Sequence, residues 1–455
     1  MAEPSDGVES EAATVRKVDQ RPLLQLVGTW PWAPWAVGAM VVLRFVAVAG
    51  LRAYIYFDSG EYDRLDFTGR WRRPWATPLL YWLVPGGLNR IVVVQALLGA
   101  LTWSILALSA AAWCRTTVVR ITLAVAILSL GATTSITNWD ATKLSESLAL
   151  SLTALVVAAW LNLVRRPLPG TAMLVVLATF PWLFVRQSLM PTAFMVALVS
   201  VGAAVVVWRR GGPAKTLAGL ALALVLLVGL ASFSYARNQE VVRENLTVIV
   251  ANRIAPDASR LAWFRAHGMP TPASGDLGRD ALRSDPAFAR WVRHAGRTTY
   301  ARYLLTHPWY SATEPLDDMV AQRRSYGDEA VVQSTMLSPA DAYGSSRPVI
   351  PEIVEQALFQ PGGTGGVIAA LAAVLGWTVA RWRRRELRWV VPLMMIAISL
   401  ASLVIAWHGA TPELSRLAIV GAVVLRLGLL LQIAGLADQE LSARRVGVVN
   451  PAGSG

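Results

Sequence analysis

The sequence predicts an all-α integral membrane protein with about ten transmembrane helices. Hydrophobic residues make up 55% of the 455 residues, charged residues make up only 16%, and the mean hydropathy is +0.46. A soluble domain of this length carries more charge and fewer apolar residues. Apolar stretches long enough to cross about 30 Å of hydrocarbon recur near residues 31–52, 91–113, 118–136, 146–164, 171–186, 189–208, 216–235, 364–381, 389–407 and 415–436.

Short clusters of basic residues predict how these spans are oriented. Basic residues accumulate in the cytoplasmic loops of membrane proteins. Clusters of this kind fall in alternate connections, at Arg16, Lys17 and Arg21; Arg115 and Arg120; Arg165 and Arg166; Arg209, Arg210 and Lys215; Arg381 to Arg388; and Arg444 and Arg445. Both termini are therefore predicted to face the cytoplasm. The same clusters account for the net charge of +13 without a nucleic-acid partner.

The chain divides into five predicted regions. The polar tails, residues 1–28 and 438–455, are expected in the cytoplasm, and the first of them is expected to be disordered. A transmembrane core is expected over residues 29–236, an extracytoplasmic loop region over 237–363, and C-terminal transmembrane helices over 364–437. The first outer loop, residues 53–90, carries the apolar stretch WRRPWATPLLYWLVPGG. This stretch is too short to span and contains three prolines, so it predicts helices lying at the membrane interface.

The longer loop region is expected to form a small, mostly helical domain. Ser284 or Asp285 as N-cap and Pro286 at the first helical position predict the start of a helix, which should end before Pro308. Apolar residues from Phe288 to Tyr303 share one stripe of this helix and arginines share the other. Such a helix is expected to lie on the outer surface of the membrane.

The polar segments between the apolar stretches fall mostly on the predicted outer side. Five of them, far apart in the sequence, are FDSGEYDRLDF, NWDATKLSES, VRQS, ANRIAPD and WHGATPELSR. A shared active site at one face of the membrane is the simplest explanation. The ANRIAPD segment differs in this respect, because Arg253 and Asp257, with His267 a little further along, are better explained as contacts within the loop fold.

Carboxylates in the first two segments are candidates for catalysis. Asp58 and Glu61 directly follow the first span, where a carboxylate could take a proton from a sugar hydroxyl or bind a divalent metal. Solvated acids paired with nearby arginines are an equally good explanation. Asp140, Lys143 and Glu146 lie at the start of a later span. For Glu146, the favourable interaction with a helix N-terminus, about 0.3–1 kcal/mol, is the simpler explanation.

Several cations are candidates for binding an anion. Arg186 lies between two spans, where its guanidinium could bind a phosphate or reach toward lipid headgroups. Arg44 and Arg426 are predicted near the middle of spans, at a cost of about 2.5–3.5 kcal/mol each, so they should face the bundle interior and pair with a carboxylate or a lipid phosphate. A single short outer connection holds His408, Glu413 and Arg416, which indicates a functional set.

Several common motifs are missing from the chain. It has no phosphate-binding glycine loop, no HExxH or CxxC metal pattern and no GxSxG nucleophile motif. A nucleotide-driven pump is therefore not expected. An enzyme at the outer face would draw its energy from a substrate already in the membrane, such as a lipid-phosphate-linked sugar.

The order of the motifs resembles the GT-C superfamily of membrane glycosyltransferases, including bacterial arabinosyl- and mannosyltransferases. The resemblance covers most of the chain and is carried by an arginine in the first span, DSGEY after it, RRPWATPLLYWLV, WDATKLSESLAL, VRQSLMP and HGATPELSRLAIV. It implies an enzyme of the cytoplasmic membrane with its active site outside. The implied partners are a polyprenyl-phosphate-sugar donor, an envelope glycan or lipid acceptor, and membrane lipids.

The resemblance also implies roles for individual residues. Asp58 matches the catalytic base, with Glu61 and Tyr62 continuing its motif, and Asp140 with Glu146 match a second acidic position. Arg186 would bind the donor phosphate. The sequence has DSGE where many members carry two adjacent acids, so no cofactor is implied with certainty and a divalent metal stays open. A transporter or flippase of a lipid-linked glycan, and a non-catalytic scaffold of an envelope-synthesis complex, are the alternatives.

Overall fold

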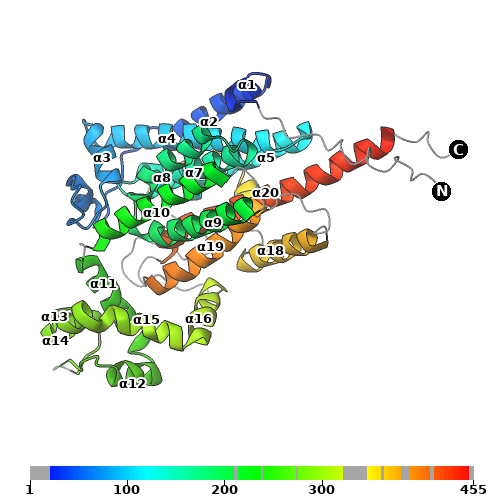
Figure 1. The fold of residues 1–455 in the computed structure, drawn as a ribbon. Helices are drawn as coiled ribbons and strands as arrows, with labels where there is room; N and C mark the ends of the chain where they lie inside the picture. The colour runs from blue at the N-terminus through cyan, green and yellow to red at the C-terminus, as the bar shows by residue number, and fades with distance from the viewer. Residues whose placement is uncertain are drawn as a thin grey trace, which may run out of the picture.

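The described part of the chain is a helical bundle with a smaller group of helices at one end (Figure 1). The computed structural model describes residues 21–209, 214–236, 239–272, 275–320, 346–359, 363–380, 390–409 and 414–449. Regular structure in these ranges is helical, apart from one isolated bridge between Tyr54 and Thr142. The predicted all-α class is therefore confirmed.

Every predicted span coincides with a helix. Six helices in the described ranges are long and apolar enough to cross a membrane, namely α4 (Leu88–Trp113), α7 (Glu146–Arg165), α9 (Met190–Arg209), α10 (Ala214–Ala236), α19 (Val390–Gly409) and α20 (Leu414–Val449). A seventh crossing would combine α5 (Thr117–Ala132) with α6 (Thr134–Thr137) and η3 (Asn138–Ala141), which bend away by 52°. The helices at the other three predicted spans are shorter: α2 (Ala33–Val48), α8 (Pro169–Leu183) and α18 (Gly363–Ala380).

The centre of the bundle forms around α4, which packs against α2, α5 and α7. Its residues Ala96, Ala100 and Trp103 are almost completely buried. Gly99 on the same helix lets Arg44 of α2 lie directly against the α4 backbone, because a Cβ at position 99 would overlap the guanidinium. Helix α20 packs along α19 and α5.

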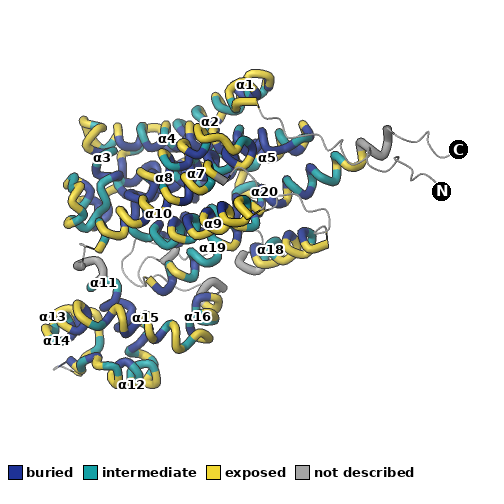
Figure 2. Tube along the Cα trace, viewed as in Figure 1, coloured by how far each residue is buried: buried dark blue, intermediate teal, exposed yellow. Residues whose placement is uncertain are grey.

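The outer surfaces of α8, α9 and α10 are apolar and exposed (Figure 2). Leu177, Leu198, Leu226 and Phe233 on these helices are each more than half exposed. Soluble monomers rarely expose contiguous apolar surfaces of this kind. Lipid acyl chains would cover them without cost, so the protein is a membrane-embedded helical bundle.

Residues 239–320 form the smaller group of helices. In chain order they are α11 (Gln239–Ile249), the π-helix η5 (Val250–Ile254), α12 (Ala258–Ala266), α13 (Arg279–Ser284), α14 (Pro286–Trp291), the π-helix η6 (Val292–Gly296), α15 (Arg297–Thr306) and α16 (Pro308–Val320). This loop domain follows α10 directly and lies at one end of the bundle (Figure 1). Its mostly helical nature agrees with the sequence prediction.

The helix predicted from Pro286 to the residues before Pro308 is present as α14, η6 and α15. The Asp285 carboxylate accepts a hydrogen bond from the Phe288 N–H at 2.7 Å, as an N-cap does. Its apolar stripe is buried, but inside the loop domain: Tyr303 packs on Phe264 of α12 with ring centroids 5.1 Å apart. The expectation that this stripe contacts the membrane surface is therefore wrong, because neighbouring loop helices cover it.

Other boundaries also differ from expectation. The short helix α1 (Leu23–Val27) lies within the predicted disordered tail. Helix α20 continues to Val449, well past the predicted end of the last span. The Asp438 carboxylate accepts hydrogen bonds from the backbone N–H groups of Arg115 and Thr116, which holds this extension against the bundle. The basic cluster around residues 381–388 and most of the first tail lie outside the described residues.

Candidate functional site

The loop of residues 53–90 is held against the start of α7 by backbone pairing. The Tyr54 N–H donates to Ala141 O at 2.7 Å, and the Lys143 N–H donates to Tyr54 O at 3.0 Å. The 3-10 helix η2 (Ser59–Asp63) follows, and the Ser59 hydroxyl accepts from the Tyr56 N–H at 2.8 Å. These two backbone hydrogen bonds bring Asp58 to the N-terminal end of α7, although the two segments lie far apart in the sequence.

A second set of contacts adds the Arg186 turn to the same place. Helix α3 (Ala76–Leu83) begins where the Ala76 N–H donates to Phe184 O at 3.1 Å. The 3-10 helix η4 (Gln187–Leu189) then leads from Arg186 into α9. The Arg186 guanidinium donates to the carbonyl of Arg416 at 3.3 Å. Three separate connections and the start of α20 therefore meet at one end of the bundle.

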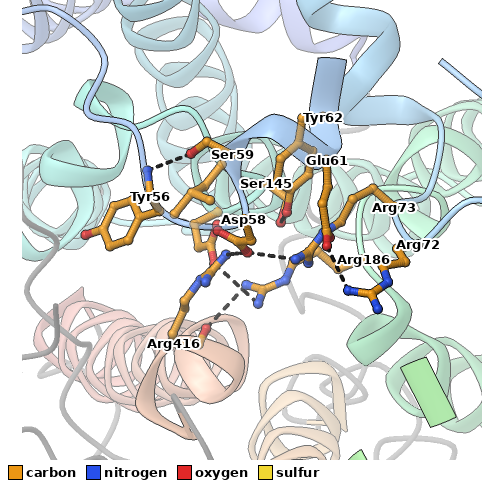
Figure 3. Close-up of polar contacts among 12 residues, drawn as sticks. Tyr56, Asp58, Ser59, Glu61, Tyr62, Arg72, Arg73, Ser145, Arg186 and Arg416 are labelled. Atoms are coloured by element: carbon orange, nitrogen blue, oxygen red, sulfur yellow. Dashed lines mark hydrogen bonds and ion pairs between the residues drawn. The ribbon is translucent and has the colours of Figure 1, made fainter. Parts of the chain in front are cut away.

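Two buried carboxylates and three arginines form the centre of this meeting point (Figure 3). Asp58 Oδ2 accepts from Arg73 Nη2 at 2.8 Å and from Arg416 Nη2 at 3.1 Å. Glu146 Oε1 pairs with Arg416 Nε and with Arg186 Nη2, the latter at 3.4 Å. The second oxygens, Asp58 Oδ1 and Glu146 Oε2, are buried and have no hydrogen-bond partner within the described ranges. Buried polar atoms usually have partners. Asp58 also lines a cavity, whereas Glu146 is completely buried and does not, so Asp58 Oδ1 is the oxygen to which a ligand could bind.

Glu61 and Tyr62 extend this network toward the solvent. Arg72 Nη1 contacts Glu61 Oε1 at 3.1 Å, and Arg73 Nε contacts Glu61 Oε2 at 2.6 Å. The Tyr62 hydroxyl donates to Ser145 Oγ at 3.2 Å, and burial raises the pKa of Tyr62. Burial alone would lower the pKa of Arg73, but Tyr62, Asp58 and Glu61 raise it overall. Arg73 therefore keeps its positive charge and Tyr62 stays neutral at physiological pH.

This network lines a cavity of about 700 Å³. Among the described residues, its lining includes six arginines, Arg72, Arg73, Arg186, Arg279, Arg283 and Arg416, and three carboxylates, those of Asp58, Glu61 and Glu244. Phe57, Val185, Pro191, Ile405 and Leu417 supply apolar wall. A cavity with more arginines than carboxylates favours an anionic ligand, and arginine binds phosphate oxygens in a bidentate manner.

Arg44 and Asp140, two separately predicted site residues, pair with each other and do not reach the cavity. Arg44 Nη1 lies 3.3 Å from Asp140 Oδ2 and donates to Gly131 O at 3.0 Å, and both side chains are 1% exposed. Asp140 Oδ1 also accepts from Ser147 Oγ at 2.6 Å. Of the two partners expected for Arg44, a carboxylate is the one found. The pair lies inside the bundle, and neither residue lines the cavity.

Four other predicted candidates lie outside the cavity wall or outside the described ranges. Arg426 donates to the carbonyls of Leu358 and Phe359, at the end of α17 (Glu352–Phe359). His408 Nε2 lies 2.9 Å from Ser311 O and so joins α19 to the loop domain. Lys143 pairs with the exposed Asp63. Glu413 lies outside the described residues.

Several arginines that line the cavity, among them Arg73, Arg279 and Arg283, were not predicted as site residues. Arg73 is one of several arginines in its loop and no sequence pattern distinguishes it, yet it contacts both Asp58 and Glu61. Arg279 and Arg283 belong to the loop domain and had no signal beyond their spacing of four residues. Asp257 behaves as the loop-contact interpretation predicts, because its carboxylate accepts from the N–H groups of Ser259 and Arg260 at the start of α12.

The described residues contain no group of three or more His, Cys, Asp or Glu side chains arranged to hold a metal. The carboxylates of the cavity are instead paired with arginines. The fold and the site together define a helical membrane protein with an arginine-rich cavity at one end. No protein-family model matches this chain, and no curated protein matches it either.

Proposed function

We propose that this protein is a membrane glycosyltransferase of the GT-C type. It would transfer a sugar from a polyprenyl-phosphate donor to an envelope glycan, lipid or protein acceptor. The observation that carries the proposal is the convergence of Asp58, Arg186 and Arg416 on one cavity. A carboxylate with one unpartnered oxygen beside several arginines is the set that a hydroxyl nucleophile and a phosphate leaving group require.

We further propose that the chain spans the cytoplasmic membrane ten times, with both termini inside and the cavity outside. Helix α7 begins directly after the cavity residue Ser145, and α20 begins two residues before the cavity residue Arg416. Helix α7 ends at Arg165, on the side of the bundle away from the cavity. Helix α9 begins close to Arg186 and ends at Arg209. Basic residues thus mark the end opposite the cavity, and such residues favour the cytoplasm.

In the proposed reaction, Arg73 and Arg416 hold Asp58 Oδ2, so that Oδ1 points to the substrate. The acceptor hydroxyl gives its proton to Oδ1 while its oxygen attacks the anomeric carbon of the sugar. The bond from that carbon to the phosphate oxygen breaks, and the electron pair stays on the phosphate. Arg186 and Arg416 stabilise the negative charge that develops there. The products are the glycosylated acceptor and the polyprenyl phosphate.

The transporter alternative has weaker support from the geometry. Transporters place their polar sites near the middle of the membrane, often at broken helices. The buried ion pair in the bundle interior, Arg44 with Asp140, is closed and 1% exposed on each side. The open arginine-rich site lies instead at one end of the bundle.

Purified protein in detergent provides the test. We expect mass spectrometry of copurifying lipids to find a polyprenyl phosphate, free or sugar-linked. We also expect radiolabelled sugar to pass from polyprenyl phosphate to an envelope extract without any sealed compartment. Movement of a lipid-linked glycan across proteoliposomes, with no transfer in detergent, would instead establish the transporter.

A further inference from the structure

The loop domain contributes its own charged group to the cavity. Arg279 and Arg283 lie four residues apart on α13, and Glu244 lies on the neighbouring helix α11. All three line the same cavity as Asp58. Arg279 Nη2 lies 2.7 Å from Glu244 Oε1, and Arg283 Nε lies 3.6 Å from Glu244 Oε2. We call Arg279 and Arg283 the rim pair.

The rim pair has one positive charge more than its partner. Two guanidinium groups share the single carboxylate of Glu244, which leaves a net charge of 2 − 1 = +1 at this wall. Within the described residues, the ion pairs of Arg279, Arg283 and Glu244 are separate from those of Asp58, Glu146 and Arg186. The cavity therefore has two separate cationic groups, one at the bundle end and one on the loop domain.

Stability does not explain the rim pair. The side chains of Arg279 and Arg283 are 50% and 48% exposed, and Glu244 is 25% exposed. Ion pairs at such exposure contribute little to stability, because water screens them and long side chains lose freedom in forming them. Exposed arginines elsewhere in the loop domain, such as Arg293 and Arg302, do not line the cavity. The placement of the rim pair is thus better explained by a ligand than by folding.

We propose that the rim pair binds a second phosphate group, distinct from the phosphate held near Arg186 and Arg416. A phosphate has enough oxygens to bond to both guanidinium groups, and Glu244 contacts both of them. This inference rests on the proposed function for the identity of the inner ligand. The second phosphate could belong to a diphosphate-linked donor or to a phosphorylated acceptor, and the two sources are separable by experiment.

Arginine footprinting tests this proposal without requiring transfer activity. Phenylglyoxal modifies accessible guanidinium groups, and peptide mass spectrometry gives the rate at each residue. Inorganic phosphate is expected to slow modification of Arg279 and Arg283 several-fold while Arg293, an exposed arginine of the same domain, is unaffected. The same protection is expected in the variant Arg186→Gln. Equal rates with and without phosphate, or equal slowing at Arg293, would overturn the proposal.

Two lipids then identify the source of the phosphate. Protection by polyprenyl diphosphate but not by polyprenyl monophosphate assigns the second phosphate to the donor. Protection by inorganic phosphate alone, with neither lipid effective, assigns it to the acceptor. Equal protection by both lipids would show that a single phosphate occupies the rim pair, and would overturn the idea of a second group. If transfer is never observed but the footprint appears, the proposed function fails while the rim site stands.

Discussion

Two sets of buried arginines and carboxylates behave differently in this molecule. In the bundle interior, Arg44 and Asp140 match one charge with one charge, and neither lines the cavity. At the end of the bundle, Asp58 and Glu146 share arginines from three segments, and each carboxylate keeps one oxygen without a partner in the described structure. A charge inside a membrane bundle is therefore not by itself a sign of function. The useful sign is an adjoining cavity, because Asp140 Oδ2 also lacks a hydrogen-bond partner in the described residues and yet Asp140 does not line the cavity.

The largest expected effect comes from removing the Asp58 carboxylate. If Asp58 is the general base, Asp58→Asn should lower the transfer rate by about 100-fold to 10,000-fold, while the protein still inserts into the membrane. The measurement is the initial rate with labelled donor, divided by the amount of folded protein. Asp63→Asn is the matched control, because Asp63 lies in the same loop and is 65% exposed. Equal rates for the Asp58 variant and this control would remove Asp58 from the mechanism.

The interior pair should affect stability and leave the chemistry alone. Arg44→Met leaves Asp140 without its cation, and breaking a buried pair costs about 3–5 kcal/mol. The double variant Arg44→Met with Asp140→Asn should recover most of that loss, because the Asn side chain can still accept from Ser147. The measurement is the free energy of unfolding in a denaturing detergent titration.

Position 99 offers an independent test of the same pair. Gly99→Ala places a Cβ where the Arg44 guanidinium lies, so it should destabilise the protein by about 1–3 kcal/mol. Unchanged stability in both Arg44→Met and Gly99→Ala would show that the two regions do not differ as described. A lower transfer rate in the folded Arg44→Met, Asp140→Asn double variant would also contradict the proposed difference between the two regions.

The sequence predicts the positions of the helices and the side on which the candidate site lies, but not which charged residues pair with each other. Both outcomes have a physical reason. Hydropathy locates the helices well, because crossing lipid requires long apolar runs. It also placed Asp58, Arg186 and Arg416 on one side. Partner choice was not predictable, because Arg44 and Asp140 meet only through the bend between α5 and η3 and the missing side chain at Gly99. The same holds for the rim pair, whose approach depends on how the loop domain folds back on the bundle.

A smaller effect is expected at Arg186, which would contact the donor phosphate. Charge-assisted hydrogen bonds contribute about 1.5–3 kcal/mol, so Arg186→Gln should raise the donor concentration needed for half-maximal rate by about 10-fold to 100-fold. Glu146 keeps Arg416 as its partner in this variant, so the fold should survive. Arg70→Gln is the control, because Arg70 is exposed and does not line the cavity. An unchanged donor requirement would assign Arg186 to folding.

The smallest effect concerns Asp257, a carboxylate that is satisfied by backbone groups and belongs to neither region. A hydrogen bond from the Ser259 hydroxyl, followed by one from the Arg260 N–H, lowers the pKa of Asp257 below its ordinary value of 3.8. The capping contribution is therefore fully present above that value and is lost as the pH falls through the lower pKa of the folded state. Asp257→Ala should cost about 0.5–2 kcal/mol, seen as faster hydrogen exchange over α12 at neutral pH.

The acid range separates this capping role from a role in the cavity. Wild type and Asp257→Ala should converge in the exchange of α12 amides as the pH drops below the ordinary aspartate value, because the protonated carboxyl no longer accepts both hydrogen bonds as strongly. Donor and acceptor requirements should stay the same in the variant, since Asp257 does not line the cavity. A changed requirement would mean that α12 transmits strain to the rim pair, and the loop domain would then join the site as a whole.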